Sequence, residues 1–151
     1  MMTLDQYVVG EKTERFGRYE MTREDVLDFA RRFDPQAFHL DDEAAKANPI
    51  FGKLAASGWH TASATMRMIV DHGAEQGGHS IGGAGLDELK WMRPVYPGDV
   101  LSAESEVLET RRSRSRPEIG TVKMRTTTFN QKNEPVMTMV ANIVVAATSA
   151  Q

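Results

Sequence analysis

The chain of 151 residues contains no cysteine. Disulfide bonds, thiolate nucleophiles and cysteine-based metal sites are therefore excluded. Metal-binding histidine motifs are also missing, because none of the four histidines stands at H-x-H or H-E-x-x-H spacing. We expect no metal site.

Long apolar runs are missing as well. The most apolar helix-like stretch, residues 54–70, is interrupted by Ser57, His60 and Arg67 and cannot cross a bilayer. The first residues lack a basic segment followed by an apolar run, so we expect no secretory signal. The formal net charge of −3 favours neither nucleic acid nor a membrane surface as a partner. We expect one cytoplasmic domain over residues 1–151.

The first half of the chain has helical periodicity. Thr22 can cap a helix over residues 23–33, where apolar side chains recur at i, i+3, i+4 and i+7 spacing. This helix must end at Asp34, because a residue before proline avoids the α conformation. A short second helix is expected over residues 42–47.

A longer helix is expected over residues 55–71, ending near Gly73. Small residues surround much of this helix, which is typical of a helix enclosed by other structure. Larger apolar residues recur on one of its faces: Trp59, Ala62, Met66, Ile69 and Val70.

Beyond a glycine-rich loop predicted over residues 77–85, the pattern alternates. Alternation of apolar and polar side chains predicts antiparallel strands. They are expected over residues 86–95, 101–107, 122–128 and 137–145, in addition to a short strand at 18–21. A basic loop over 111–120 and a polar turn over 130–134 connect the later strands. The result is an α+β fold, with about five strands around one buried helix.

Asp34 and His39 are candidate acid–base partners, five positions apart in a loop after the first helix. Phe33, Phe38 and Leu40 surround them with apolar bulk. Partial burial would raise the pKa of Asp34 toward neutrality, where proton transfer is most effective. The alternative is that both residues form the polar end of a surface turn.

Gly58 is a candidate oxyanion donor at the start of the long helix. The first N–H groups of a helix are free and can stabilise developing negative charge. Small residues there would equally allow close packing of the helix on the sheet, which is the alternative. His60 is either a contact of this site or a packed histidine.

Four arginines within residues 111–116 are candidate phosphate ligands, with Arg114 and Arg116 as the main contacts. The alternative is a solvated hairpin loop. The glycines of residues 77–85 match neither a Walker loop nor a dinucleotide fingerprint.

Three motifs occur in a fixed order along residues 19–145. They are Asp34-Pro35-Gln36-Ala37-Phe38-His39-Leu40-Asp41, Ala56-Ser57-Gly58-Trp59-His60-Thr61-Ala62 and Trp91-Met92-Arg93-Pro94-Val95-Tyr96-Pro97-Gly98-Asp99. Together they resemble the MaoC-like acyl-CoA dehydratases, a family that includes the (R)-specific enoyl-CoA hydratases. The resemblance implies the hot-dog fold, an antiparallel sheet wrapped around a long central helix.

The resemblance also implies a hydro-lyase of acyl-CoA metabolism. Asp34 and His39 would hold one water, which adds to the β-carbon of a trans-2-enoyl-CoA. Gly58 would polarise the thioester carbonyl through its amide, with Ser57 hydrogen-bonded near the carbonyl or the water. Coenzyme A is part of the substrate, so no separate cofactor is expected. A homodimer, or a higher oligomer, is the expected assembly.

Trp59 and His60 are candidate pocket contacts, and Arg114 and Arg116 candidate coenzyme A contacts. The chain departs from the family pattern at Pro35-Gln36, where the family often has Asn, and at Ser57, where His is common. These departures bear on which acyl-CoA is used. Two alternatives are a non-catalytic acyl-CoA or acyl-carrier binding protein and a hot-dog thioesterase. A thioesterase generally needs a carboxylate on the central helix, and residues 55–70 contain none.

Overall fold

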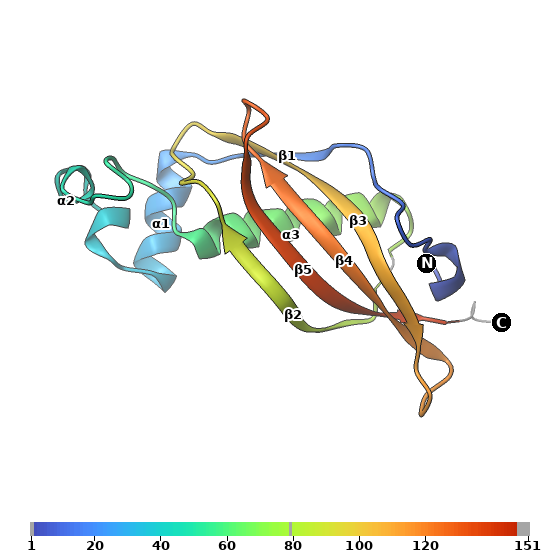
Figure 1. The fold of residues 1–151 in the computed structure, drawn as a ribbon. Coiled ribbons are helices and arrows are strands. Elements are labelled where there is room, and N and C mark those ends of the chain that lie inside the picture. Colours follow the sequence, from blue (N-terminus) through green and yellow to red (C-terminus); the bar gives the residue numbers. More distant parts are fainter. Residues whose placement is uncertain (1, 79, 148–151) are drawn as a thin grey trace.

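The computed structural model describes residues 2–78 and 80–147, so His79 of the predicted glycine-rich loop lies outside the described residues. One antiparallel sheet has the strand order β1-β3-β4-β5-β2. Helix α3 (Gly58–Glu75) lies against one face of this sheet, while α1 (Arg23–Phe33) and α2 (Asp42–Lys46) lie together at one end (Figure 1). This is the hot-dog fold that the resemblance implied.

All strands except β2 are longer than the segments predicted for them. Their bounds are β1 (Phe16–Glu20), β2 (Gly82–Trp91), β3 (Val100–Arg112), β4 (Ile119–Phe129) and β5 (Pro135–Ala146). Because β3 and β4 stay paired to Arg112 and Gly120, the basic loop is shorter than predicted.

Strand β2 begins and ends four residues earlier than predicted. Gly82 and Gly83 belong to the strand and pair with Val144 and Ile143 of β5. Glycine is unfavourable within a strand, so local pattern could not assign these residues to β2. Only one side of β2 is paired, which makes it an edge of the sheet.

Helices α1 and α2 have the predicted starts. The Thr22 hydroxyl accepts a hydrogen bond from the Asp25 amide at 3.1 Å, which caps α1. Asp41 caps α2 in the same way, through the Ala44 amide at 2.9 Å. Between the two helices, a single 3-10 turn over Ala37–His39 reverses the chain.

Helix α3 differs from the prediction at both ends. It begins at Gly58 rather than Ala55, because the Ala56 amide donates to the Val95 carbonyl at 2.8 Å and keeps this segment extended. The stop predicted at Gly73 is wrong, since Gly73 is buried inside the helix, which continues to Glu75. No helix within the described residues is long and apolar enough to cross a membrane.

The face of α3 turned toward the sheet carries mostly small and hydroxylated side chains. Its buried residues are His60, Thr61, Ala64, Thr65, Met68 and Gly73. Thr65 and Thr128 share a hydrogen bond of 2.7 Å between their hydroxyls, so these polar groups are satisfied in the core. Close approach of helix and sheet explains why larger side chains are few on this face.

Three of the larger apolar residues of α3 face the opposite way. Trp59, Met66 and Val70 are 55%, 47% and 56% exposed in the single chain. The prediction of a helix enclosed by other structure therefore holds for only one side of α3, because no element of residues 2–78 and 80–147 covers the side that carries these three residues.

Candidate active site

The turn after α1 brings Asp34 and His39 together. Asp34 is the C-cap of α1, and its amide still donates to the Ala30 carbonyl at 2.9 Å. The following 3-10 turn returns the chain, so that His39 Nε2 lies 3.5 Å from Asp34 Oδ2. The two side chains are only 5% and 15% exposed. The structure therefore joins the two residues in one partly enclosed site.

The tautomer of His39 follows from its second nitrogen. Nδ1 lies 2.8 Å from the carbonyl oxygen of Ala55. A carbonyl oxygen can only accept, so Nδ1 carries a proton and donates it. In the neutral imidazole, Nε2 is then an acceptor, and it faces the carboxylate of Asp34. The rings of Phe38 and Phe51 hold the imidazole at centroid distances of 4.5 Å and 5.5 Å.

Asp34 accepts hydrogen bonds on both carboxylate oxygens. The Ser57 hydroxyl donates to Oδ2 at 2.7 Å, and the Gln36 side-chain amide donates to Oδ1 at 2.6 Å. Burial by itself would raise the pKa of Asp34, but these two hydrogen bonds and the nearby His39 lower it, and the net pKa lies below its usual value. The raised pKa expected from the sequence is therefore wrong, because local burial was considered without the donors.

Ser57 is fully buried and has two hydrogen-bond partners. Its hydroxyl oxygen donates to Asp34 and accepts from the Trp59 amide at 3.2 Å, which caps α3. Ser57 was predicted to form a hydrogen bond near the thioester carbonyl or the water, and this stays a prediction. In the structure its hydroxyl contacts the Asp34 carboxylate.

The Gly58 amide follows Ser57 directly and belongs to the first turn of α3. Amides of a first helical turn have no partner within the helix, and no hydrogen bond to this amide occurs within residues 2–78 and 80–147. Close packing, the alternative explanation for a glycine at this position, is also observed. A Cβ on Gly58 would lie 2.4 Å from Trp91 Cε2, so only glycine fits beneath this ring.

Trp91 begins the third sequence motif, but no role was predicted for it. It is the last residue of β2, and its indole N–H donates to the Gly58 carbonyl at 2.9 Å. The ring of Trp59 meets it edge to face, with centroids 5.2 Å apart. The one signal in the sequence was its place in the strand that leads into Arg93-Pro94-Val95.

His60 lies in the packing between α1 and β1. Its ring stacks on Phe29 at 4.8 Å, and Nε2 lies 3.1 Å from the Tyr19 hydroxyl. Burial lowers the pKa of His60, while Asp25 acts weakly in the opposite direction. Its position is that of the packed histidine which the sequence analysis kept as an alternative.

The arginine hairpin lies far from the two catalytic candidates of the same chain. Arg114 and Arg116 belong to the β3–β4 connection, at the end of the sheet opposite to α1 and α2 (Figure 1). Arg116 forms an ion pair with Glu118 at 2.9 Å. The structure does not bring these arginines together with Asp34 and His39.

Cationic side chains do lie near the site, in a hollow of about 330 Å³ that the sequence analysis missed. Lys53, Arg93 and Lys132 line it together with Asp99 and Glu134, and Arg93 pairs with Glu134 at 3.0 Å. Its wall includes Tyr96, whose hydroxyl donates to the Phe51 carbonyl at 2.7 Å. This hollow is therefore joined to the ring that packs against His39.

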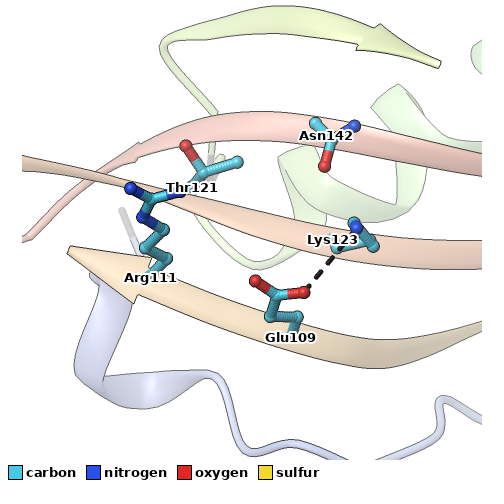
Figure 2. A pocket seen from close by; sticks show the side chains of 5 residues that line it. All are labelled: Glu109, Arg111, Thr121, Lys123 and Asn142. Carbon is cyan, nitrogen blue, oxygen red and sulfur yellow. Dashed lines mark ion pairs between the residues drawn. The ribbon is translucent and has the colours of Figure 1, made fainter. Parts of the chain in front are cut away.

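A smaller pocket of about 170 Å³ lies on the outer face of the sheet. Figure 2 shows its lining side chains, Glu109, Arg111, Thr121, Lys123 and Asn142. Lys123 pairs with Asp87 at 2.9 Å and Glu109 at 3.6 Å. Its neighbour Val122 is buried on the other face, so this pocket and the Asp34–His39 pair are unrelated.

No group of three or more side chains that could hold a metal ion occurs within the part of the chain that the structure describes. The groups available for catalysis at this site are the Asp34 carboxylate, the His39 imidazole with its acceptor nitrogen, and the Gly58 amide at the start of α3.

The family model of the MaoC like domain matches residues 6–130. This match covers most of the chain and includes the Asp34–His39 turn and the start of α3. The chain belongs to the MaoC-like family.

Similar proteins agree with this assignment. The crystal structure of a MaoC-like dehydratase from Rhodospirillum rubrum has a TM-score of 0.89 and 41% identity, covering 99% of this chain and 100% of that one. An (R)-hydratase from A. caviae involved in PHA biosynthesis has a TM-score of 0.69 and 25% identity, covering 93% and 98%. The uncharacterized protein YdeM of Bacillus subtilis (strain 168) is 31% identical over 137 residues, 89% of this chain and 92% of that protein.

Proposed function

We propose that the protein adds water across the 2,3 double bond of a trans-2-enoyl-CoA, or removes it from the corresponding 3-hydroxyacyl-CoA. The observation that carries this proposal is that two hydrogen-bond acceptors, one on His39 and one on Asp34, lie close together. With Nδ1 donating to Ala55, Nε2 of His39 is an acceptor without a donor among the described residues. It lies 3.5 Å from Asp34 Oδ2, which accepts from Ser57 and can accept one more hydrogen bond.

A single water molecule satisfies both acceptors, because it can donate one hydrogen to each. Its oxygen lone pair is then directed away from the pair and toward the substrate. Two acceptors that hold the same water orient it and increase its nucleophilicity as one O–H bond breaks.

The step balances without a further reactant. The water oxygen bonds to the β-carbon, one water proton passes to the Asp34–His39 pair, and the pair delivers one proton to the α-carbon. The carbon–carbon double bond becomes single, and the second hydrogen of water stays on the new hydroxyl. The pair ends with the protons it began with, so it is ready for another turnover.

Negative charge develops on the thioester oxygen before the α-carbon is protonated. The free Gly58 amide stabilises that charge, because it lies at the positive end of α3, adjacent to the serine that contacts Asp34. Removing an oxyanion donor typically costs about 10²–10³ in kcat.

The substrate is proposed to be an acyl-CoA, held near the interface of a homodimer. The free edge of β2 and the exposed stripe on α3 are the surfaces that a second copy would cover. Lys53 and Lys132 line the hollow that Tyr96 joins to Phe51, and we propose that they meet phosphate oxygens of coenzyme A.

The deciding experiment follows the conjugated thioester absorbance of a panel of trans-2-enoyl-CoAs. The wild-type protein should hydrate at least one of them. Asp34→Asn and His39→Gln should each lower kcat by about 10²-fold or more, because each replaces a basic group that can take the water proton by an amide that cannot. Asp28→Asn and His72→Gln are matched controls outside the site and should stay within about twofold of wild type.

Three other outcomes would each contradict the proposal. Hydration that persists in both Asp34→Asn and His39→Gln would remove the proposed pair. Release of free thiol would make the protein a thioesterase. Tight coenzyme A binding with no turnover of any substrate would make it a binding protein.

A further inference from the structure

Trp91 connects the edge of the sheet to the start of α3. Its indole N–H donates to the Gly58 carbonyl at 2.9 Å, although the two residues are 33 positions apart in the chain. The ring also lies directly over Gly58, where an added Cβ would come within 2.4 Å of it. The contact therefore combines a hydrogen bond with close packing.

The peptide group between Gly58 and Trp59 is held at both ends. Its carbonyl oxygen accepts from Trp91 on β2, and its N–H donates to the Ser57 hydroxyl at 3.2 Å. That hydroxyl donates in turn to Asp34 at 2.7 Å. One continuous series of hydrogen bonds thus runs from the last residue of β2 to the proposed water-binding carboxylate.

The Gly58 amide lies on the preceding peptide group, directly adjacent to this anchored one. The conformation of Gly58 is not in the left-handed region, so its backbone does not require glycine. The three atoms nearest to an added Cβ all belong to the Trp91 ring. A glycine has more backbone freedom than any other residue. An external contact that restricts it therefore has a direct effect on where its amide points.

We propose that Trp91 is a positioning residue for the Gly58 amide, an inference that rests on the proposed function. The indole N–H holds the first peptide of α3 in place, so that the neighbouring amide is already directed at the thioester oxygen when charge develops there. Preorganisation of this kind acts on the transition state more than on substrate binding.

Trp91→Phe tests this inference, because it keeps an aromatic ring over Gly58 and removes only the N–H donor. The expected result is a kcat lower by about 3- to 10-fold, the range for one net hydrogen bond, with KM changed by less than about twofold. Trp59→Phe is the matched comparison. It removes the neighbouring indole N–H and should affect KM more than kcat, as expected for a wall of the pocket.

A spectroscopic measurement separates positioning from a merely structural role. A saturated acyl-CoA labelled with ¹³C at the thioester carbonyl binds without turnover. Its carbonyl stretch in infrared difference spectra should move to lower frequency on binding to wild type, because a hydrogen bond polarises the carbonyl. The displacement should be smaller in Trp91→Phe and unchanged in Trp59→Phe.

The two proposals fail in different ways. A wild-type protein that hydrates enoyl-CoA, with kcat and carbonyl frequency both unchanged in Trp91→Phe, would overturn the role of Trp91 alone. A carbonyl displacement that depends on Trp91, without any hydration, would keep that role and overturn the hydratase. Absence of both turnover and carbonyl displacement in wild type would overturn the two together.

Wild-type protein gives an answer even if Trp91→Phe folds poorly. In ¹⁵N spectra, the indole N–H of Trp91 should exchange with solvent more slowly than that of Trp59, and its resonance should move when the saturated acyl-CoA binds. Equal exchange of the two indoles and no movement on binding would contradict the inference.

Discussion

At the scale of single residues, Ser57 links the helix to the proposed chemistry. One hydroxyl caps α3 through the Trp59 amide and also donates to the Asp34 carboxylate. The family pattern often has histidine at this position. A buried serine is smaller, and here its hydroxyl is used to keep Asp34 ionised.

Ser57→Ala should reduce both stability and its dependence on pH. The lost N-cap costs about 1 kcal/mol. The folded-state pKa of Asp34 lies below its unfolded value, so its carboxylate stabilises the fold above about pH 4, and this stabilisation is lost as pH falls through the lower folded pKa. Without the serine donor that pKa should rise, and the acid-dependent loss in urea unfolding should shrink.

Ser63→Ala is the control for this prediction. Ser63 lies on the same helix, is exposed, and donates only to the Trp59 carbonyl at 2.8 Å. Its replacement should leave the acid dependence as in wild type. An equal acid dependence in Ser57→Ala and wild type would show that the serine does not influence the Asp34 pKa.

At the scale of elements, the segment before β1 forms part of a second apolar cluster that the sequence analysis left unassigned. A 3-10 turn, Leu4–Gln6, packs on β4 so closely that a Cβ on Gly120 would lie 2.6 Å from Leu4 Cδ2. Tyr7 follows this turn and packs against the cluster. Its members are Leu4, Val107, Val122, Val145 and Ala147.

The Tyr7 hydroxyl lowers the stability of the fold, because it is buried and has no hydrogen-bond partner among the described residues. Burial also raises the pKa of Tyr7 to about 12. The raised pKa means that the neutral phenol stabilises the fold below about pH 10 and that this contribution is lost as pH rises toward 12. Tyr7→Phe should therefore be more stable at pH 7, by about 1 kcal/mol, and should lack this alkaline loss in urea unfolding.

Tyr96→Phe should behave in the opposite way at pH 7. The Tyr96 hydroxyl donates to the Phe51 carbonyl at 2.7 Å, so its removal leaves that carbonyl without its donor and should destabilise the fold. If Tyr7→Phe is as destabilising as Tyr96→Phe, the Tyr7 hydroxyl has a partner in solution.

At the scale of the whole molecule, two exposed surfaces, one on α3 and one at the edge strand β2, adjoin each other at Trp59 and Trp91. The exposed side of α3 carries Trp59, Met66 and Val70, and the free edge of β2 carries Leu86 and ends at Trp91. Apolar side chains and unpaired strand groups gathered in this way favour association. This is the surface on which we expect the homodimer to form.

Light scattering should give a mass of twice the 16.8 kDa of one chain. Val70→Glu combined with Leu86→Glu should dissociate the dimer, because two carboxylates per chain would be buried without partners. Val8→Glu is the control, since Val8 is 59% exposed and belongs to neither feature. A dimer that survives the double change, or a wild-type monomer, would contradict this assignment.

The sequence by itself determined those features that depend on neighbouring residues. Thr22 and Pro35 define α1, because capping and the proline restriction are local effects, and the predicted span agrees with the structure. Alternation located the cores of β3, β4 and β5 for the same reason. The turn that unites Asp34 and His39 lies within six residues, so the pair could be proposed from spacing and family resemblance.

Tertiary structure alone decided what depends on distant partners. The start of α3 follows from the bond between Ala56 and Val95, and the direction of the Asp34 pKa follows from Ser57, 23 positions away. Sequence patterns report which residues are apolar but not which side the sheet will cover, so the outward face of α3 was unexpected. The contact between Trp91 and Gly58 needs strand and helix to be packed before it exists.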